Sequence, residues 1–201
     1  MVFTEIALVL TGIAGFVLFF NRNPKRSPPA NHDVVVSPAD GKVRRPFKIS
    51  SVKSLFGASD AAIKELDEQG PHMVVPINLS LLDVHVTRAP CSAKVVDIIH
   101  QRGKFLHAIC KSSLIKNQRN IIVMRRKNMN FAVVQSTGAL ARRVRAWVKP
   151  GQTVATGQTI GRILLGSNTS LIIPAKHFRY VAQHRRRVKA GESVLGMLKA
   201  D

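Results

Sequence analysis

The chain has few acidic residues and almost no cysteine. Its 201 residues include 11 Asp and Glu and two Cys, against 31 Lys and Arg, so the net charge is +20. Between Ile98 and Gly191 there is no carboxylate, although 19 Lys and Arg fall there. A hydrolase with paired carboxylates, or an enzyme with an oxygen-ligated metal, would have to use the first half of the chain. Cys91 and Cys110 form no CxxC motif, which disfavours a disulfide framework and a structural zinc site. We expect no metal.

Aromatic residues that could alternate with the basic ones are also scarce. The chain has one Trp and one Tyr and no basic–aromatic interleaving, so a nucleic-acid-binding protein is a weak alternative and we expect no nucleic acid partner. A charge of +20 still predicts attraction to a polyanion, and an anionic membrane surface is the other candidate. With 45% hydrophobic residues, the chain is long enough to fold around a core of its own.

The N-terminal segment favours the membrane. Residues 6–20 carry no charge and belong to the apolar stretch Val2–Phe20, at the short end of the roughly 17–25 residues that span a bilayer. A buried core helix is the alternative. The flank that follows is basic, and no small-residue cleavage site for a signal peptide is found. We therefore predict a membrane anchor helix over residues 1–20, with the rest of the chain in the cytoplasm. Three prolines make residues 21–33 a predicted linker.

Residues 34–201 have the pattern of a mainly β, β-rich α+β domain. Helical periodicity appears only at Ala58–Gln69, where Ser59 or Asp60 could cap the helix and Gly70-Pro71 ends it. Short β-branched runs between turn residues predict strands at Val34–Val36, Met73–Val75, Val84–Val86, Val95–Ile99, Asn120–Met124 and Phe131–Val134.

A short motif occurs twice near the C-terminus. V-K-x-G-x-x-V spans Val148–Val154 and returns 40 residues later at Val188–Val194. Coincidence in a chain rich in Gly, Val and Lys is one explanation. The other is a pair of similar turn-and-strand units, which predicts a barrel-sandwich, biotinyl/lipoyl-like C-terminal portion.

Three segments place reactive residues between apolar strands. The first, S-P-A-D-G-K-V, has Asp40 in a typical turn sequence. In the second, D-V-H-V-T-R-A-P, strand alternation puts Asp83 and His85 on one face, either as an acid–base pair or as a solvated polar stripe. The third breaks two apolar strands at Gly166-Ser167, and its spacing alone predicts only a β-turn.

Taken together and in order, these segments resemble the short, type II branch of the phosphatidylserine decarboxylase family. Each motif alone is weak, whereas the ordered set is specific and covers residues 34–198. The further matching pieces are Gly103-Lys104-Phe105-Leu106-x-Ala108, Asn117-Gln118-Arg119-Asn120, Gly138-x-x-Ala141-Arg142-Arg143 and I-G-x-I-L-x-G-S. The chain departs from the family's usual residues at Leu81, Thr87, Gln118 and Asn168, and the family often has Pro where Leu81 stands.

The resemblance implies a self-processing proenzyme. Ser167 would attack the carbonyl of Gly166, and elimination and hydrolysis would leave a pyruvoyl group derived from Ser167. The products would be a β chain, residues 1–166, and an α chain, residues 167–201, held together as a heterodimer. His85 would act as the base, and Asp40 would orient its imidazole. The pyruvoyl group would form a Schiff base with phosphatidylserine, release carbon dioxide and yield phosphatidylethanolamine, with His85 as the proton donor.

The implied substrate is an anionic lipid, so the cationic domain would face the cytoplasmic side of the cell (inner) membrane. Arg142 and Arg143 are candidate headgroup ligands or else buried structural residues. Arg185–Arg187 with Lys189 would form a membrane-facing patch or a solvated charge run. A decarboxylase of archaetidylserine is a close alternative, and a membrane-tethered biotinyl-like adaptor without catalysis is the alternative from another class. The sequence leaves open whether the protein forms a homo-oligomer.

Overall fold

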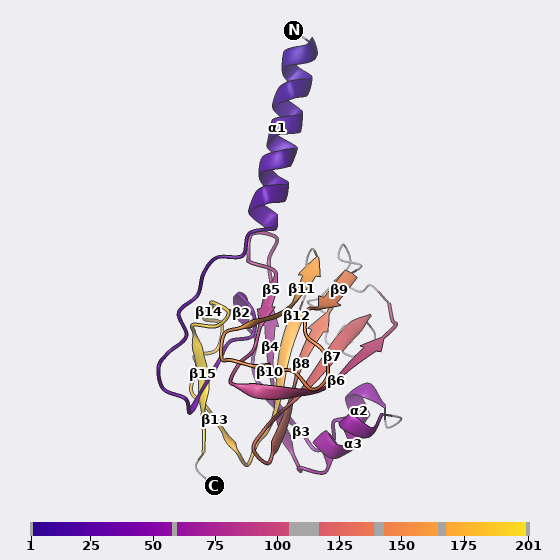
Figure 1. Cartoon of the computed structure of the whole chain (residues 1–201), viewed down its shortest axis with the longest axis vertical. Coiled ribbons are helices and arrows are strands. Elements are labelled where there is room, and N and C mark those ends of the chain that lie inside the picture. The colour runs from indigo at the N-terminus through magenta and orange to yellow at the C-terminus, as the bar shows by residue number, and fades with distance from the viewer. Residues whose placement is uncertain (1, 58–59, 105–116, 139–142, 165–167, 200–201) are drawn as a thin grey trace.

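In the computed structural model the N-terminal segment is one helix that stands clear of the remaining chain. The structure describes residues 2–57, 60–104, 117–138, 143–164 and 168–199. Helix α1 (Val2–Phe20) projects from one end of the β-rich domain (Figure 1). In its stretch Phe3–Phe20 the mean hydropathy is 2.1 and only 6% is buried. The predicted apolar helix is therefore confirmed, and its exposure fits membrane association and not a core helix.

Most of the domain is one curled antiparallel sheet. Its spatial order is β10 (Thr153–Val154), β6 (Ala93–Gln101), β7 (Arg119–Arg126), β8 (Met129–Ser136), β12 (Asn168–Pro174), β4 (His72–Asn78), β2 (Gly41–Val43) and β14 (Arg187–Val188), with β3 (Phe47–Ile49) beside β4. Within the described residues two smaller sheets accompany it, β5 (Val86–Arg88) with β11 (Thr159–Leu164) and β9 (Arg143–Ala146), and β1 (Val34–Val36) with β15 (Val194–Leu198) and β13 (Phe178–Tyr180). The predicted mainly β class is confirmed.

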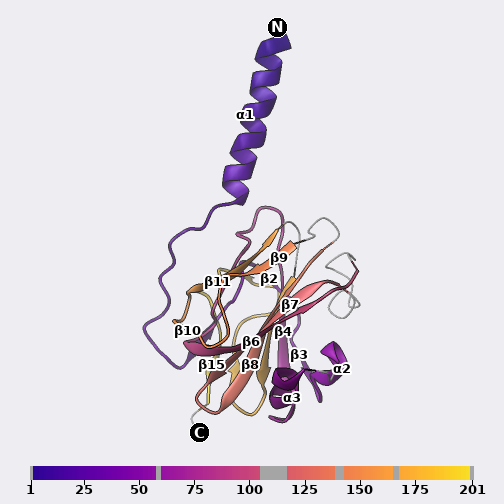
Figure 2. The ribbon, with the colours of Figure 1, turned by 45° about the vertical axis from the view of Figure 1, so that its right-hand side comes forward.

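The large sheet buries both of its faces. Neighbours such as Ile121 and Ile122 point to opposite sides, because successive side chains of a strand alternate. Ile122 lies in the core under the two smaller sheets. Ile121 packs with the helices α2 (Lys53–Phe56) and α3 (Ala61–Asp67), which Figure 2 shows low on the flank of the sheet. These strands could be predicted from the sequence because they are continuous apolar runs, as strands buried on both faces require.

The predicted helix and one predicted strand have other bounds in the structure, and helix α2 and strands such as β3, β9 and β13 were not predicted. The helix is confined to Ala61–Asp67, and the Asp60 carboxylate caps it by accepting a hydrogen bond of 2.9 Å from the amide of Ala62. Helix α2 was not predicted, since four residues are too few to display a period. The strand predicted at Val84–Val86 begins only at Val86.

The two V-K-x-G-x-x-V segments form similar turns. Gly151 and Gly191 have φ angles of 87° and 78°, a region that favours glycine. In both turns the amide three residues after the lysine donates to the lysine carbonyl, at 3.1 Å for Lys149 and 3.3 Å for Lys189. The two copies of the motif therefore have the same local turn geometry.

The linker is extended but fastened along the domain. The Arg88 guanidinium donates to the side-chain oxygen of Asn23 at 2.6 Å and to the carbonyl of Pro24 at 2.8 Å. Farther along, Arg26 lies 2.8 Å from a carboxylate oxygen of Asp40. Figure 1 shows this segment running down the side of the domain from the base of α1. These contacts fix the segment that follows α1 to the domain.

Candidate active site

The end of the large sheet below α1 carries polar side chains in place of apolar ones. Two neighbouring rows run across β4, β12, β8, β7 and β6: Asn78, Asn168, Ser136, Arg119 and Gln101, then Ile77, Thr169, Gln135, Asn120 and His100. Most of these polar side chains are buried. Buried polar groups destabilise a fold unless they are hydrogen-bonded, so their concentration at one end marks a candidate site.

Hydrogen bonds connect the second polar row to strand β5. The side-chain amide of Gln135 donates to the hydroxyl of Thr87 at 2.9 Å, and its oxygen accepts from Asn120 at 3.4 Å. The oxygen of Asn120 lies 2.6 Å from Nδ1 of His100. This chain of contacts holds β5 against the face of the large sheet and so positions His85, which directly precedes Val86 of β5.

His85 is buried, and one of its ring nitrogens has no partner. Nδ1 lies 2.8 Å from the main-chain carbonyl oxygen of Asp83. A carbonyl only accepts, so Nδ1 carries a hydrogen and the neutral ring keeps its lone pair on Nε2. Nε2 is buried without a hydrogen-bond partner among the described residues. A buried lone pair of this kind is available to take a proton.

The surroundings of His85 keep the ring neutral. Phe20, the last residue of α1, packs on it with the ring centroids 4.4 Å apart. Burial is the largest cause that lowers the pKa of His85, and the positive charges of Arg162 and Arg22 lower it further, while Asp83 acts in the opposite direction. Neutral imidazole is the form that a general base requires.

The described partners of the Asp40 carboxylate do not include His85. One of its carboxylate oxygens accepts from the amide of Ala190 at 2.7 Å, and the other binds Arg26. Burial raises the pKa of Asp40, and the Ala190 amide and the Arg26 charge only partly offset it. Among the described residues no hydrogen bond joins Asp40 to His85. The predicted role of Asp40 in orienting His85 stays a prediction. In the structure, the Asp40 carboxylate binds Arg26 of the linker and the amide of Ala190.

The predicted cleavage pair, Gly166 and Ser167, lies outside the described residues. The residues that flank it lie at the polar end of the sheet. The amide of Ile163 donates to the carbonyl of His85 at 3.0 Å, next to Leu164 at the end of β11. On the other side, the Asn168 side chain donates to that of Asn78 at 2.9 Å. Both flanks therefore lie at the end of the sheet where His85 lies.

Of the two candidate headgroup ligands, Arg142 also lies outside the described residues. Arg143 is exposed and opens β9, where it lies opposite Leu164 in the register. That position places its backbone at the same end as His85, and its exposure is inconsistent with the alternative of a buried structural arginine.

Comparison with known proteins identifies the family. The family model described as phosphatidylserine decarboxylase matches residues 13–196. The phosphatidylserine decarboxylase proenzyme of Carboxydothermus hydrogenoformans is 35% identical over 92% of this chain and 80% of its own length. A protein of Methanocaldococcus jannaschii that carries the name of an archaetidylserine decarboxylase proenzyme is 32% identical over 97% of this chain and 96% of its own. This chain belongs to the phosphatidylserine decarboxylase family.

Membership of the phosphatidylserine decarboxylase family confirms the predicted enzyme class, a carboxy-lyase proenzyme of phospholipid biosynthesis. It also counts against the adaptor without catalysis. Several residues of the family motifs had no role predicted from the sequence. Arg119 and Asn120 belong to the polar rows, and the Asn117 side chain donates to the carbonyl of Thr137 at 2.7 Å. Polar residues that interrupt an apolar strand were the available signal. No signal pointed to Phe20.

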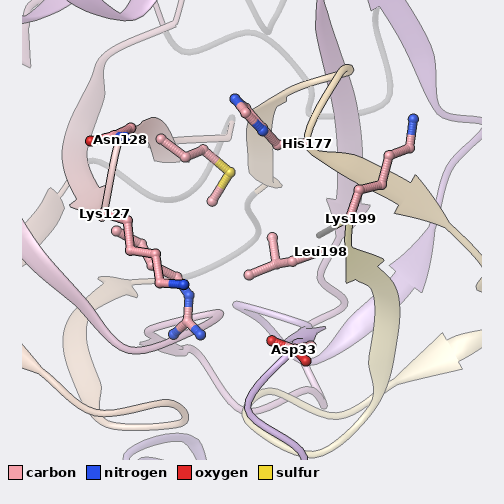
Figure 3. Close-up of a pocket in the computed structure, with 8 residues that line it drawn as sticks. Asp33, Lys127, Asn128, His177, Leu198 and Lys199 are labelled. Atoms are coloured by element: carbon pink, nitrogen blue, oxygen red, sulfur yellow. The ribbon is translucent and has the colours of Figure 1, made fainter. Parts of the chain in front are cut away.

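An open pocket of about 360 Å³ lies elsewhere (Figure 3). Its wall includes Lys127 and Asn128, which form the turn of the β7–β8 hairpin, together with His177 and Lys199. That turn is the opposite end of the two strands from Arg119 and the polar rows. This pocket is therefore separate from the candidate active site of the decarboxylase.

Proposed function

We propose that this chain is the proenzyme of a pyruvoyl-dependent phosphatidylserine decarboxylase whose pyruvoyl group is formed from Ser167. The observation that carries the proposal is a buried, neutral His85 with an unpartnered Nε2, at the sheet end where both flanks of the Gly166–Ser167 pair lie. The hydroxyl of Thr169 is likewise buried without a partner among the described residues. These two unpartnered polar groups fit a site made to hold a further reactive group.

In the self-cleavage, His85 serves as the base. Its Nε2 takes the hydroxyl proton of Ser167, so that the oxygen can attack the carbonyl carbon of Gly166. The Asp83 carbonyl holds Nδ1–H and thereby fixes the tautomer that leaves Nε2 free. The family resemblance implies that Asp40 orients the His85 imidazole, although its described contacts are with Arg26 of the linker and the amide of Ala190.

The chains produced by cleavage would remain one folded unit. The α chain begins at Ser167 and includes β12, whose hydrogen bonds run to β8 on one side and to β4 on the other. Both neighbours belong to the β chain. Removing β12 would break two ladders of the central sheet, so the α and β chains form an obligate heterodimer.

In the decarboxylation, a pyruvoyl group supplies an electron sink for the bond between the carboxylate and the α-carbon of the substrate. His85, once it has taken a proton on Nε2, can deliver that proton to the substrate carbon, and its lowered pKa favours the release of that proton. Burial by Phe20 excludes water from one side of the ring.

We propose phosphatidylserine in the cytoplasmic leaflet as the substrate. A charge of +20 and an apolar anchor with a basic flank support that location. Arg143, exposed at the same end of the domain as His85, is a candidate ligand for the headgroup. Archaetidylserine is the second candidate, because the M. jannaschii relative matches nearly the full length of both chains. The two similar glycine turns support a barrel-sandwich, biotinyl-like C-terminal portion.

Intact masses of the full-length protein test the proposal. Wild type should give two chains divided between Gly166 and Ser167, with a blocked N-terminus on the smaller one, and Ser167→Ala should stay whole. His85→Ala should also stay whole, whereas His184→Ala, at an exposed histidine, should divide like wild type. A single uncut wild-type chain that releases no carbon dioxide from phosphatidylserine would overturn the proposal, and normal cleavage by His85→Ala would remove His85 as the base.

A further inference from the structure

Two leucines are exposed at the tip of the turn that connects β4 to β5. Leu82 is 66% exposed and Leu81 is 41% exposed. A single exposed leucine is common on protein surfaces and needs no explanation. Two consecutive exposed leucines at the tip of one tight turn, close to an apolar helix that is also exposed, mark an interaction site.

The turn is built to hold this shape. The amide of Asp83 donates to the carbonyl of Ser80 at 3.1 Å, which closes the turn. The Asp83 carboxylate accepts from both the amide and the hydroxyl of Ser80 at 2.7 Å. Its other oxygen binds the guanidinium of Arg187. The leucines therefore project from a rigid support, and their exposure does not come from a loose loop.

The turn is also attached to the end of the anchor helix. Arg22 donates to the carbonyl of Leu82 at 2.5 Å and to the carbonyl of Phe19 at 2.8 Å, and its guanidinium lies 3.8 Å from the centre of the Phe19 ring. Figures 1 and 2 both show the turn before β5 directly under the lower end of α1. One arginine thus joins the carbonyl end of the helix to the tip of the turn.

We propose that the Leu81–Leu82 turn is a second membrane contact, which enters the boundary between headgroups and acyl chains beside α1. The lipid surface is the occupant because the turn continues the apolar surface of a helix long enough to span a bilayer. Arg22 places a positive charge beside the leucines, which favours anionic headgroups, and the side chain of Arg187, paired with Asp83, is 67% exposed.

The contact would set the height of the reaction site. His85 follows Leu82 by three residues, and Phe20 packs on its ring. A turn seated in the headgroup layer on one side and the end of α1 on the other would hold the imidazole at the level of the lipid headgroups. The inference depends on α1 lying in a bilayer and is independent of the pyruvoyl chemistry.

A single tryptophan reports the depth of the turn. In a Trp147→Phe background, the full-length protein carries either Leu82→Trp or the control Phe47→Trp and is reconstituted in vesicles of phosphatidylcholine and phosphatidylglycerol. Phe47 is a matched control, because it is 41% exposed and lies beside Val74, away from the Asn78 end of β4. Lipids with a nitroxide near the top of the acyl chain serve as the quencher.

The Leu82→Trp protein should emit at shorter wavelength than the control and should lose most of its intensity to the nitroxide lipid, while the control loses little. Adding Leu81→Asp should return the emission and the quenching toward control values, because moving one leucine out of an apolar phase changes the equilibrium at least about tenfold. Equal quenching of Leu82→Trp and the control would overturn the proposal. Protection from aqueous acrylamide without lipid quenching would also overturn it, since protein, such as a second copy of this chain, would then cover the turn.

Discussion

Replacing Arg26 by Met should release the linker from the domain. Arg26 and Asp40 form a buried pair, with side chains 9% and 11% exposed and atoms 2.8 Å apart. Arg26 also reaches Glu192 at 3.3 Å. Without Arg26, the Asp40 carboxylate keeps only the Ala190 amide, so a buried charge loses its partner. Breaking a buried pair in this way costs about 3 kcal/mol or more of unfolding free energy.

Removing the charge of the other member of the pair, Asp40, should lower the unfolding free energy less. In Asp40→Asn the new side-chain oxygen can still accept from Ala190, and Arg26 keeps its half-exposed partner Glu192. We expect a cost of about 1 kcal/mol, the value of one hydrogen bond. Arg26→Met should therefore destabilise the domain more than Asp40→Asn, although the two changes remove opposite members of one pair.

The cost of Arg26→Met should also depend on pH. Burial already raises the pKa of Asp40 in the folded protein, and Arg26 is one of the groups that lower it. Losing Arg26 raises that pKa further, so the folded state binds a proton that the unfolded chain releases. Stability of the variant relative to wild type should then recover as the pH falls through the folded pKa of Asp40. Asp40→Asn has no carboxyl at position 40 and should not recover through this route.

Urea unfolding in detergent micelles measures these differences, with circular dichroism as the signal and Ser167→Ala as the background to keep one chain. The reasoning fails if Arg26→Met costs no more than Asp40→Asn at pH 7, or if its cost is unchanged at lower pH. Self-cleavage gives a second comparison. Equal slowing by both variants indicates that Asp40 acts through the linker, whereas loss of cleavage in Asp40→Asn alone indicates a direct action on His85.

Three further outcomes are expected. Phe20→Ala admits water to His85 and raises the pKa of its imidazole, so the acidic limb of the pH profile for self-cleavage should move to higher pH; an unmoved limb counts against the packing argument. Gly161→Ala places a Cβ 2.4 Å from the carbonyl oxygen of Arg145 and should cost about 2–3 kcal/mol in urea unfolding, and a stable variant would contradict this. Cys91 is buried with its pKa raised to about 12, so peptide mapping should find it unmodified by iodoacetamide at pH 8 until the protein unfolds; rapid labelling would refute its burial.

The strands were predictable because this sheet is buried on both faces, which leaves continuous β-branched runs such as Asn120–Met124. The prediction from side-chain alternation along a strand was wrong at Asp83. Strand periodicity placed its side chain with His85, but the strand begins only at Val86 and Asp83 closes a turn, so its carboxylate bonds to Ser80 and Arg187. A period of two holds only where the backbone is extended.

The contacts within the candidate site could not be predicted from the sequence as readily as the strands could. His85 could be selected from its motif. Its Nδ1 partner is a main-chain carbonyl, and because every residue has one, the sequence does not show which residue supplies it. The Arg26–Asp40 pair joins a linker to a turn, and the packing of Phe20 on His85 joins the anchor to the strand region 65 residues later. Such contacts depend on the tertiary path of the chain, because neither hydropathy nor spacing encodes which surface a linker follows.

The fastened linker has a consequence for kinetics. Because Arg88 and Arg26 bind the segment after α1 to the domain, the catalytic portion cannot swing freely on a tether. With α1 in a bilayer, as proposed, encounters with substrate would become a two-dimensional search by lateral diffusion, with the domain at one fixed orientation to the bilayer. The rate would follow the mole fraction of substrate in the leaflet, and diluting the whole vesicle suspension at constant lipid composition would leave turnover per enzyme unchanged.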